Sequence, residues 1–382
     1  MKTGVHRIGI MGCGKIFPAY MRGLARFEHL EVVHCADIIS ERALLGHQQY
    51  GIPRWGGPDD LLDDEEVEIV LNLTPPTTHM EVSWAALEAG KHVYSEKPIT
   101  TDLGDANRLL ALAEAKGLAL GAAPDTFLGS WGATSRAIVD SGLLGEIVGA
   151  TAFAAHNRVE TWHPEPTFLF KPGGGPSLDR GPYYVTALVN LLGPVAEVSG
   201  MSRMGPPQRL VTAPNRLVDV VDVEIPTHAT GLLRFASGVV ATVVFSSDVW
   251  ATEAPHIELY GTEGTLSLPH PNWFDGDVRI KGTSRDAEWQ TVPPVVPVGA
   301  QRGEGIADLV ASFDGRQART SAVLARHVLE VLLALGRSAQ ERAFVSIQSR
   351  CERPVWVDLP CPTWPVPDDQ SSAGCQLGGG ES

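Results

Sequence analysis

The sequence contains few cysteines, little positive charge and no long hydrophobic run. Its five cysteines among 382 residues are odd in number and scattered, which fits neither a disulfide framework nor the spacing of a metal site. We therefore expect no metal and a reduced, cytoplasmic location. No run reaches the roughly 18 apolar residues of a membrane-spanning helix. The N-terminus lacks the basic, apolar and cleavable regions of a secretion signal, so we expect no secretion.

Acidic residues outnumber basic residues in this chain. Asp and Glu total 45 against 30 for Lys and Arg, which gives a formal net charge of −15 at pH 7. Such a surface repels nucleic acid and anionic membranes, so neither is an expected partner. Hydrophobic residues make up 43% of the chain and charged residues 20%, a globular composition with enough length for two or three domains.

Short apolar runs alternate with helical patterns over the first 125 residues. The runs that predict strands are Arg7–Met11, Glu31–Ala36, Glu68–Leu73, Lys91–Tyr94 and Leu118–Ala122. Strands and helices in alternation imply right-handed crossovers and a parallel sheet. We therefore predict an α/β protein whose residues 1–125 form a Rossmann domain with a doubly wound parallel sheet.

Strand patterns dominate after residue 126. A helix at 131–141 precedes a strand at Ile147–Ala155, and a second helix, Asp179–Leu192, stops at Gly193. Two hairpins follow, and a late helix is expected to pack on the resulting sheet. The hairpins pair Thr230–Phe235 with Val239–Phe245 and Ile257–Tyr260 with Thr265–Leu268, and the late helix is Ala322–Leu335. Residues 126–360 thus predict an α+β domain with an open, mainly antiparallel sheet. The tail at 361–382, rich in Pro, Gly and Ser, is expected to be disordered.

Gly12 and Gly14 lie where the first predicted strand turns into a helix. The first glycine allows a tight turn, and the second lets a pyrophosphate approach the backbone. The helix start at Lys15 and Ile16 then offers free N–H groups to the phosphates. Phe17 replaces the third glycine of the usual fingerprint, which predicts looser packing of helix against strand.

Asp37 ends the second predicted strand, where a carboxylate accepts hydrogen bonds from an adenosine ribose. A carboxylate at this point repels a 2′-phosphate, so the sequence favours NAD over NADP. Arg42 follows on the next helix and is placed to contact the adenine or a phosphate, which keeps NADP as an alternative. Asp37 also has the alternative interpretation of a helix cap.

Glu96-Lys97-Pro98 follows the strand pattern at Lys91–Tyr94, at the edge where parallel sheets bind ligands. Pro98 rigidifies the chain behind Lys97. A lysine beside a nicotinamide can hydrogen-bond the reacting oxygen and stabilise a developing alkoxide. For an isolated triplet of this kind, a surface salt bridge is the competing interpretation.

In this position the triplet resembles the catalytic-lysine signature of the Gfo/Idh/MocA oxidoreductase family, which includes glucose-fructose oxidoreductase and inositol dehydrogenases. The resemblance extends to about Leu359. Thr74-Pro75-Pro76 with His79 is similar to the family's segment against the cofactor, and Gly173–Gly175 followed by Asp179–Tyr183 is similar to its substrate-site helix. The cofactor contacts that the resemblance implies are Thr74, Pro75, His79, Glu96 and Lys97.

The family's helix usually has His and Asp where this chain has Tyr183 and Thr186. Asp179, Tyr183 and Thr186 still share one face of a helix. Tyrosine is a poor base at neutral pH, but a neighbouring ammonium such as Lys97 favours its ionised form. We therefore predict Lys97 and Tyr183 as the acid/base pair, with Asp179 orienting the substrate or the pair. The alternative is that Tyr183 is a packing aromatic.

His163 is the rival base, because it lies in a loop bounded by prolines and titrates near neutral pH. A structural loop histidine is the alternative interpretation. Asp179, Tyr183, His163 and Thr186 are the leading candidates for substrate contacts. Further candidates, predicted on weaker grounds, are Asp125, His156, Asn157, Arg158 and Trp162.

Taken together, these residues predict an NAD-dependent dehydrogenase that oxidises a secondary hydroxyl of a sugar, glycoside or cyclic polyol. The alternatives are a keto-sugar reductase, a redox-neutral NAD-dependent glycosidase or lyase, and a non-catalytic NAD-binding regulator; an imine- or pterin-type reductase is disfavoured by the segment at Asp179. An open sheet leaves an apolar face to cover, so we expect a homo-oligomer, a dimer or a tetramer.

Overall fold

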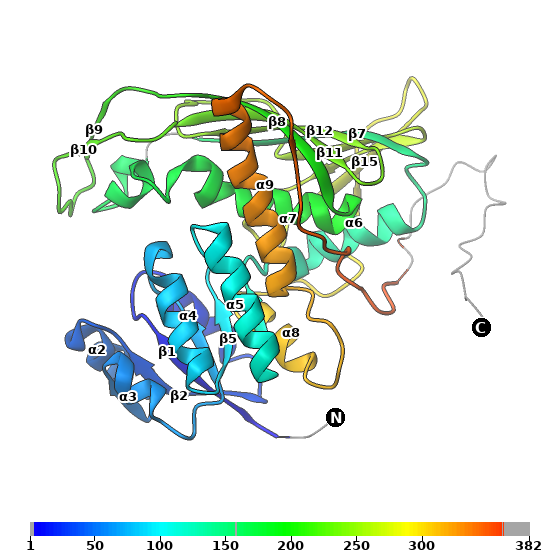
Figure 1. Ribbon diagram of the computed structural model, residues 1–382. Coiled ribbons are helices and arrows are strands. Elements are labelled where there is room, and N and C mark those ends of the chain that lie inside the picture. Colours follow the sequence, from blue (N-terminus) through cyan, green and yellow to red (C-terminus); the bar gives the residue numbers. More distant parts are fainter. Residues whose placement is uncertain (1–3, 157–158, 361, 363–382) are drawn as a thin grey trace.

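Two sheets organise the chain, a six-stranded sheet near the N-terminus and a nine-stranded sheet after it (Figure 1). The computed structural model describes residues 4–156, 159–360 and 362. Asn157, Arg158 and, apart from Pro362, the predicted tail at 361–382 lie outside the described residues.

The first sheet has the strand order β3-β2-β1-β4-β5-β6, and every neighbouring pair is parallel. This order confirms the predicted doubly wound Rossmann sheet. Its strands are β1 (His6–Met11), β2 (Leu30–Ala36), β3 (Arg54–Gly56), β4 (Ile69–Asn72), β5 (His92–Ser95) and β6 (Leu120–Ala122). The helices that accompany them are α1 (Phe17–Leu24), α2 (Ser40–Tyr50), α3 (Pro58–Leu62), α4 (His79–Glu88) and α5 (Leu103–Lys116).

The central strands are apolar because helices cover both faces of this sheet. Ile8 and Ile10 of β1 are fully buried. Between them, Gly9 leaves room for Leu61 and Val67, whose side-chain atoms would lie only 2.9–3.0 Å from a Cβ at this position. The strand therefore needs glycine at the point where α3 crosses it.

Phe17, in the place of the third glycine, packs against the second helix. The Phe17 side chain is buried and packs edge-to-face on Tyr50, with ring centroids 5.6 Å apart. Gly46 of α2 makes this possible, because a Cβ there would lie 3.1 Å from the Phe17 ring. A glycine on the second helix thus replaces the missing third glycine of the turn.

The second sheet has the order β16-β15-β14-β13-β7-β12-β11-β8-β17. All neighbouring pairs are antiparallel except β7 with β12, so the sheet is mainly antiparallel as predicted, and both predicted hairpins are present. Its strands are β7 (Ile147–Ala155), β8 (Val195–Arg203), β11 (His228–Phe235), β12 (Val240–Ser246), β13 (Ile257–Gly261), β14 (Gly264–Leu268), β15 (Val278–Gly282), β16 (Gln290–Val292) and β17 (Val345–Ser346). A separate hairpin is formed by β9 (Gln208–Leu210) and β10 (Val220–Asp222).

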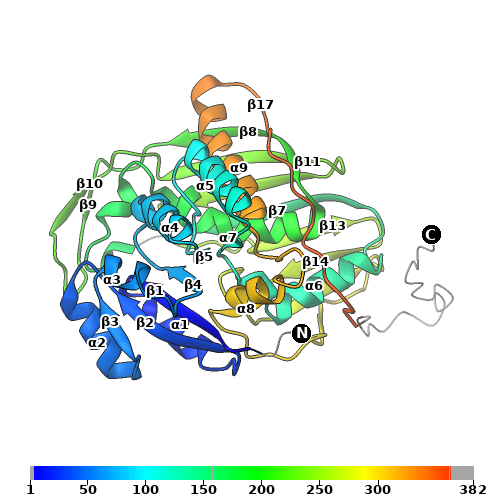
Figure 2. The ribbon, with the colours of Figure 1, turned by 60° about the horizontal axis from the view of Figure 1, so that its bottom comes forward.

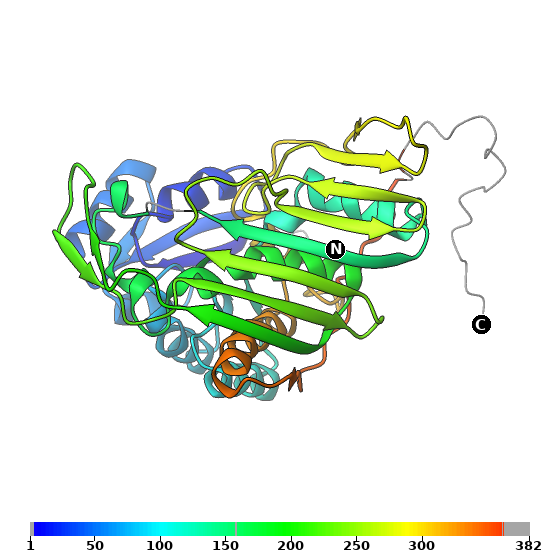
Figure 3. The ribbon, with the colours of Figure 1, turned by 90° about the horizontal axis from the view of Figure 1, so that it is seen from above.

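Three helices cover the inner face of the second sheet: α6 (Ser130–Asp140), α7 (Gly175–Leu192) and α9 (Ala322–Glu341). They lie between this sheet and the first domain, as Figure 1 shows. The α7 helix begins four residues earlier than predicted, at Gly175. Seen from the other side, the strands present an outer face on which Figure 3 shows no helix in the described part of the chain.

One helix of the second half of the chain returns to the first sheet. This helix, α8 (Glu304–Ala311; gold in Figure 2), contacts β5 and β6. Its Ile306 and Leu309 are buried in the same apolar cluster as Ile8 and Tyr94. The loop before α8 is thereby brought to the boundary between the two sheets, and this position matters for the site.

Across the described residues, none of the helices is both long enough and apolar enough to span a membrane. No group of three or more His, Cys, Asp or Glu side chains in the same residues has the arrangement of a metal site.

Candidate active site

A cavity of about 440 Å³ opens where the carboxyl ends of β1, β4 and β5 meet α7 and the loop before it. The first domain lines it with Lys15, Ile16, Thr74, Pro76, His79, Glu96, Lys97 and Pro98. The second domain lines it with Trp162, His163, Phe168, Leu169, Gly173, Gly174, Leu178, Asp179 and Tyr183. All four residues predicted for catalysis, Lys97, His163, Asp179 and Tyr183, therefore line one cavity. Of the predicted cofactor contacts, Pro75 is exposed and Pro76 lines the cavity instead.

The glycine turn has the shape that a dinucleotide needs. Gly12 has a φ of +103°, and a Cβ there would lie 2.9 Å from the carbonyl carbon and oxygen of Leu73. At Gly14, in contrast, a Cβ would meet nothing within 4 Å, so open space adjoins the backbone. No side chain caps the start of α1. The residues present thus fit a diphosphate at this turn.

Asp37 connects the glycine turn to the second helix. Its Oδ2 accepts the backbone N–H of Cys13 at 2.9 Å, and its Oδ1 accepts that of Ile39 at 2.8 Å. A carboxylate has about four acceptor positions, so lone pairs remain for ribose hydroxyls. Arg42 is exposed on the first turn of α2. The helix-cap interpretation of Asp37 is wrong, because the N-cap of α2 is Ile39 and no side chain caps this helix, whereas ribose binding stays compatible with the two bonds that Asp37 makes.

His79 holds two loops of the cavity together. Its Nδ1 lies 2.6 Å from the carbonyl oxygen of Pro98, and its Nε2 lies 2.8 Å from that of Thr74. The side chain is fully buried. His79 thus acts on the cavity through Thr74 and Pro98, the residues that follow β4 and β5.

Glu96 is a buried carboxylate directly before Lys97. Its Oε1 accepts the Tyr20 hydroxyl at 2.8 Å, and its Oε2 accepts the backbone N–H of Lys97 at 3.0 Å. Burial opposes the charged form of Glu96, but the nearby Arg302 and Lys97 lower the pKa of this carboxyl below its usual value. A negative charge therefore lies next to Lys97.

Lys97 crosses from the first domain to α7. Its Nζ donates to Asp179 Oδ1 at 3.0 Å and to the Asp179 carbonyl at 2.9 Å. Burial opposes the charged form of Lys97, but Asp179, Tyr183 and Glu96 raise the pKa of the amine above its usual value. Asp179 is bound by Lys97 and lies near Arg180, and these cations hold its pKa below the usual range in spite of its burial. Lys97 is therefore a fixed ammonium at neutral pH.

Tyr183 lies between two cations. The Lys97 Nζ is 5.3 Å from the centre of the Tyr183 ring, and Arg302 Nη2 donates to the Tyr183 hydroxyl at 3.2 Å. The tyrosine is buried at the wall of the cavity. Sequence reasoning missed Arg302, because it lies in a loop without a motif, 119 positions from Tyr183.

His163 lies across the cavity in an aromatic loop. Its ring packs edge-to-face on Trp162 and Phe168, with centroids 5.6 and 5.4 Å apart. Its Nδ1 faces the backbone N–H of Glu165 at 3.1 Å, so this nitrogen is the acceptor and Nε2 carries the proton of the neutral ring. Burial and the nearby Lys15 lower the pKa of His163. Lys15 Nζ also lies 4.0 Å from the Trp162 ring, which connects this loop to the glycine turn.

Two predicted substrate residues do not reach the cavity. Asp125 is fully buried, and its oxygens bond Arg302 and the backbone N–H groups of Gly303 and Gly305. Thr186 is also buried, and it borders a small internal void beside Pro182. The side chains of Asp125 and Thr186 therefore do not line the cavity in which the sequence predicts substrate contacts.

His156 is half-buried at the end of β7, and burial with the nearby Arg180 lowers its pKa. The predicted contacts of Asn157 and Arg158 fall outside the described residues.

Comparison with known proteins agrees with this geometry. Residues 6–123 match the model of the oxidoreductase family with an NAD-binding Rossmann fold, and residues 133–267 match the model of the Gfo/Idh/MocA C-terminal domain. The chain belongs to the Gfo/Idh/MocA oxidoreductase family. Its first domain is accordingly an NAD-binding Rossmann domain, and both the predicted family and the predicted cofactor class are confirmed.

Relatives in this family act on different sugars and polyols. A dTDP-3,4-didehydro-2,6-dideoxy-alpha-D-glucose 3-reductase of Actinomadura kijaniata is 33% identical over 51% of this chain and 58% of its own length. An inositol 2-dehydrogenase of Salmonella paratyphi B is 33% identical over 29% of this chain and 34% of its own length. The chain thus spans less than two thirds of the length of these curated relatives.

Solved structures resemble this family member along nearly its full length. An NAD binding oxidoreductase from Klebsiella pneumoniae superposes with a TM-score of 0.79 at 21% identity, covering 90% of this chain and 99% of that one. A levoglucosan dehydrogenase in complex with NADH and L-sorbose superposes with a TM-score of 0.78 at 19% identity, covering 91% and 100%. At these identities the likeness establishes the fold.

Proposed function

We propose that this protein is an NAD-dependent dehydrogenase that oxidises a secondary hydroxyl of a sugar, glycoside or cyclic polyol. The observation that carries the proposal is the convergence of Lys97, Asp179 and Tyr183 in one cavity beside the glycine turn. Gly12, Gly14 and Asp37 would hold the NAD, with Thr74, Glu96 and Lys97 beside it. When bound, the nicotinamide supplies the redox chemistry by accepting or returning hydride.

Tyr183 and Lys97 divide the proton chemistry in this proposal. Tyr183, as its phenolate, takes the proton of the reacting hydroxyl and becomes the neutral phenol while the carbon that bears the hydroxyl is oxidised. Lys97, held as an ammonium by Asp179, donates a hydrogen bond to the reacting oxygen and stabilises its developing negative charge. Asp179 orients Lys97 through two contacts, one from its side chain and one from its backbone.

Tyr183 is favoured over His163 as the base. The His163 Nδ1 is already an acceptor for the Glu165 N–H, which leaves the proton on Nε2. A ring nitrogen that carries a proton cannot accept another. Tyr183, in contrast, has a hydroxyl oxygen at the wall of the cavity with a cationic donor on it.

NAD is favoured over NADP because Asp37 lies where the adenosine ribose of a Rossmann domain binds. A 2′-phosphate there would meet a carboxylate that is fixed by two backbone N–H groups. Arg42 on the surface of α2 is the counterargument, and it keeps NADP as the second candidate.

A keto-sugar reductase is the second candidate function. The related dTDP-sugar 3-reductase favours it, because the same side chains serve in reverse, with Tyr183 returning a proton to the reduced oxygen. A redox-neutral glycosidase or lyase would use the same pair without net change of the cofactor. A regulator without activity would not need a buried ammonium and a tyrosine in one cavity.

A second copy of the chain is proposed as the partner. The outer face of the second sheet exposes apolar side chains such as Met201 and Leu232. We propose that a homo-oligomer covers this face, which light scattering of the purified protein would test. The cytoplasmic location stays a prediction.

The test of the proposed function is the formation of NADH. The purified protein is mixed with NAD and a panel of monosaccharides, glycosides and inositols, and the absorbance of reduced cofactor is followed. We expect turnover with at least one compound, loss of turnover in Tyr183→Phe, and retention in His163→Asn. NAD binding without turnover of any hydroxyl compound would contradict the proposed dehydrogenase activity. Oxidation of NADH by keto-sugars would then support the reductase.

A further inference from the structure

Arg302 reaches the site from the loop before α8. Its backbone packs tightly on α1, because a Cβ on Gly23 would come within 1.6 Å of the Arg302 carbonyl oxygen. Its side chain is only 11% exposed and passes between the two domains. The position of this guanidinium is therefore set by close packing of the main chain and by burial of the side chain.

Three acceptors surround the buried guanidinium. Its Nη1 donates to Asp125 Oδ1 at 2.9 Å, and its Nη2 donates to Asn272 Oδ1 at 2.6 Å and to the Tyr183 hydroxyl at 3.2 Å. Asp125 is in turn fixed by the backbone N–H groups of Gly303 and Gly305, at 3.0 and 3.2 Å. The planar fork of arginine suits such a set, whereas lysine lacks the geometry.

The charge of Arg302 persists in spite of its burial. Burial alone would lower the pKa of the guanidinium, but Tyr183, Asp125 and Glu96 raise it well above the usual value. A fixed cation that donates to a phenol oxygen favours the ionised phenol. Arg302 is the only donor to this oxygen among the residues that the structure describes.

We propose that Arg302 is a positioning residue for Tyr183: held by Asp125 and Asn272, its guanidinium stabilises the tyrosinate that takes the substrate proton. The inference rests on the proposed function. The proton passes from the substrate hydroxyl to the Tyr183 oxygen, and Arg302 keeps all its own protons. This assigns Asp125, Asn272 and Arg302 to one support behind Tyr183, outside the lining of the cavity.

Other charged and titratable groups surround Tyr183, and their effects differ from that of Arg302. Lys97 faces the ring and is paired with Asp179, so it places a cation beside the phenol without bonding its oxygen. The remaining groups on elements packed around it are Glu96 after β5, Tyr20 on α1, Asp125 after β6 and His163 in the loop before α7. Arg302 is thus the group whose removal acts most directly on the hydroxyl.

The test is a titration of tyrosinate by ultraviolet absorbance in the cofactor-free protein. Subtracting the curve of Tyr183→Phe isolates Tyr183 from the other five tyrosines. In a double variant, Arg302→Met with Asp125→Asn, both buried charges are removed together, which avoids leaving one unpaired. We expect the Tyr183 signal to move upward by about one to two pH units. Arg302→Lys should recover part of this shift.

Arg136→Lys is the matched control for Arg302→Lys. Arg136 is similarly buried, with 10% exposure, but it bonds the carbonyl oxygens of Asn190 and Pro354. We expect no shift in this variant. If the double variant does not fold, Asn272→Ala is the deciding test. This variant removes one of the contacts that hold the Arg302 guanidinium, so we expect the Tyr183 titration to move upward by a smaller amount. An unchanged tyrosinate titration in the folded Arg302 or Asn272 variants overturns the proposal.

The same variants separate this inference from the proposed function. In the active enzyme, the acid limb of the pH profile of kcat should move upward in parallel with the titration, while the KM for NAD stays the same. If the tyrosinate titration shifts in the Arg302 variants but Tyr183→Phe retains full activity, the Arg302–Tyr183 pairing stands and Tyr183 is rejected as the base. If the tyrosinate titration does not shift but Tyr183→Phe is inactive, Tyr183 stands as the base and the role of Arg302 is rejected.

Discussion

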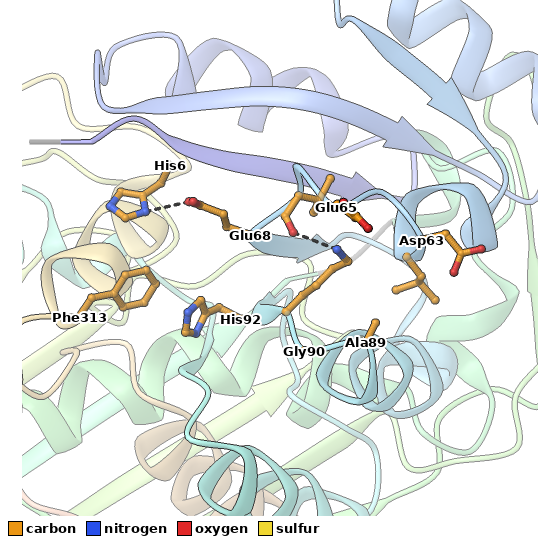
Figure 4. Close-up of a pocket in the computed structure, with 11 residues that line it drawn as sticks. His6, Asp63, Glu65, Glu68, Ala89, Gly90, His92 and Phe313 are labelled. Atoms are coloured by element: carbon orange, nitrogen blue, oxygen red, sulfur yellow. Dashed lines mark hydrogen bonds and ion pairs between the residues drawn. The ribbon is translucent and has the colours of Figure 1, made fainter. Parts of the chain in front are cut away.

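Two cavities open at opposite edges of the first sheet, and they gather different side chains. The amino-edge cavity, about 570 Å³, lies where β1, β4 and β5 begin, whereas the cavity with Lys97, about 440 Å³, lies where they end. Figure 4 shows the amino-edge cavity. Its lining consists of His6, Leu62, Asp63, Glu65, Val67, Glu68, Ala89, Gly90, Lys91, His92 and Phe313.

The two cavities differ in what their polar side chains bond. Lys91 donates to the carbonyls of Asp64 and Val67 at 2.7 and 2.9 Å, and so serves its own domain. Lys97 donates to Asp179 of the second domain. The distinguishing feature is that buried charges from distant segments meet at the carboxyl edge, where parallel strands direct their loops.

The largest expected effect distinguishes these two lysines. Lys97→Met removes the ammonium at the reacting oxygen, and we expect kcat/KM to fall about 10²- to 10⁴-fold. Lys91→Met should leave kcat/KM near the wild-type value and lower the free energy of unfolding by about 1–3 kcal/mol, because two carbonyls lose a donor. Steady-state kinetics and urea denaturation check both. Equal losses of activity would remove the contrast between the two edges.

A second prediction concerns cofactor choice at the carboxyl edge. Asp37→Ser removes the carboxylate that repels a 2′-phosphate, so the ratio of kcat/KM for NADP to that for NAD should rise about 10- to 100-fold. Glu68→Gln removes a carboxylate at the amino edge and should leave this ratio unchanged. A constant ratio in Asp37→Ser would show that the adenosine ribose binds elsewhere.

The amino edge should respond to pH through stability. The His92 Nδ1 accepts the Ala119 N–H at 2.8 Å, and burial lowers the pKa of His92 below its usual 6.5. The unfolded chain thus binds the proton first, so this stabilisation is present above about pH 6.5 and is lost as pH falls through the lowered pKa. When the pH is lowered below about 6.5, we expect the free energy of unfolding, measured by urea denaturation, to fall about 1 kcal/mol more in the wild type than in His92→Gln, which cannot titrate at this position. Parallel curves for the two proteins would reject this account.

The smallest effect is expected at the His6–Glu68 pair. The two groups lie 3.0 Å apart, and the Glu68 side chain is 46% exposed. Solvent screens such pairs, so Glu68→Gln should change the free energy of unfolding by less than about 1 kcal/mol and leave kcat unchanged. Thermal unfolding and the sugar assay check this, and a marked fall in kcat would assign a function to the amino-edge cavity.

Patterns of neighbouring residues in the sequence predicted the strands and hairpins that such patterns determine. The buried strands of the first sheet and the hairpins of the second appear in the sequence as apolar runs with turns between them. The β3 strand lies at the edge of its sheet and none of its three residues is buried, so it has no apolar run, and α8 was not predicted either. Phe17 shows a related limit, because the glycine that accommodates it, Gly46, lies on another helix.

The candidate site was predictable in part for the same reason. Lys97 and Asp179 belong to motifs, and the structure brings them together. Arg302 belongs to none, and its contacts with Tyr183 and Asp125 span 119 and 177 positions. Asp125 looked like a substrate contact because it follows the first domain, but burial assigns it to Arg302. Sequence cannot show which charges share a buried space.

The most direct test of the central claim follows the hydrogen that leaves the substrate. A carbon-deuterated form of whichever sugar or polyol supports turnover is incubated with NAD and the protein, and the cofactor and the product are analysed by mass spectrometry. The account predicts deuterium in the reduced cofactor, one ketone formed for each cofactor reduced, and neither in Tyr183→Phe. A cleaved or rearranged product with no net NADH, or deuterium that never reaches the cofactor, would contradict it.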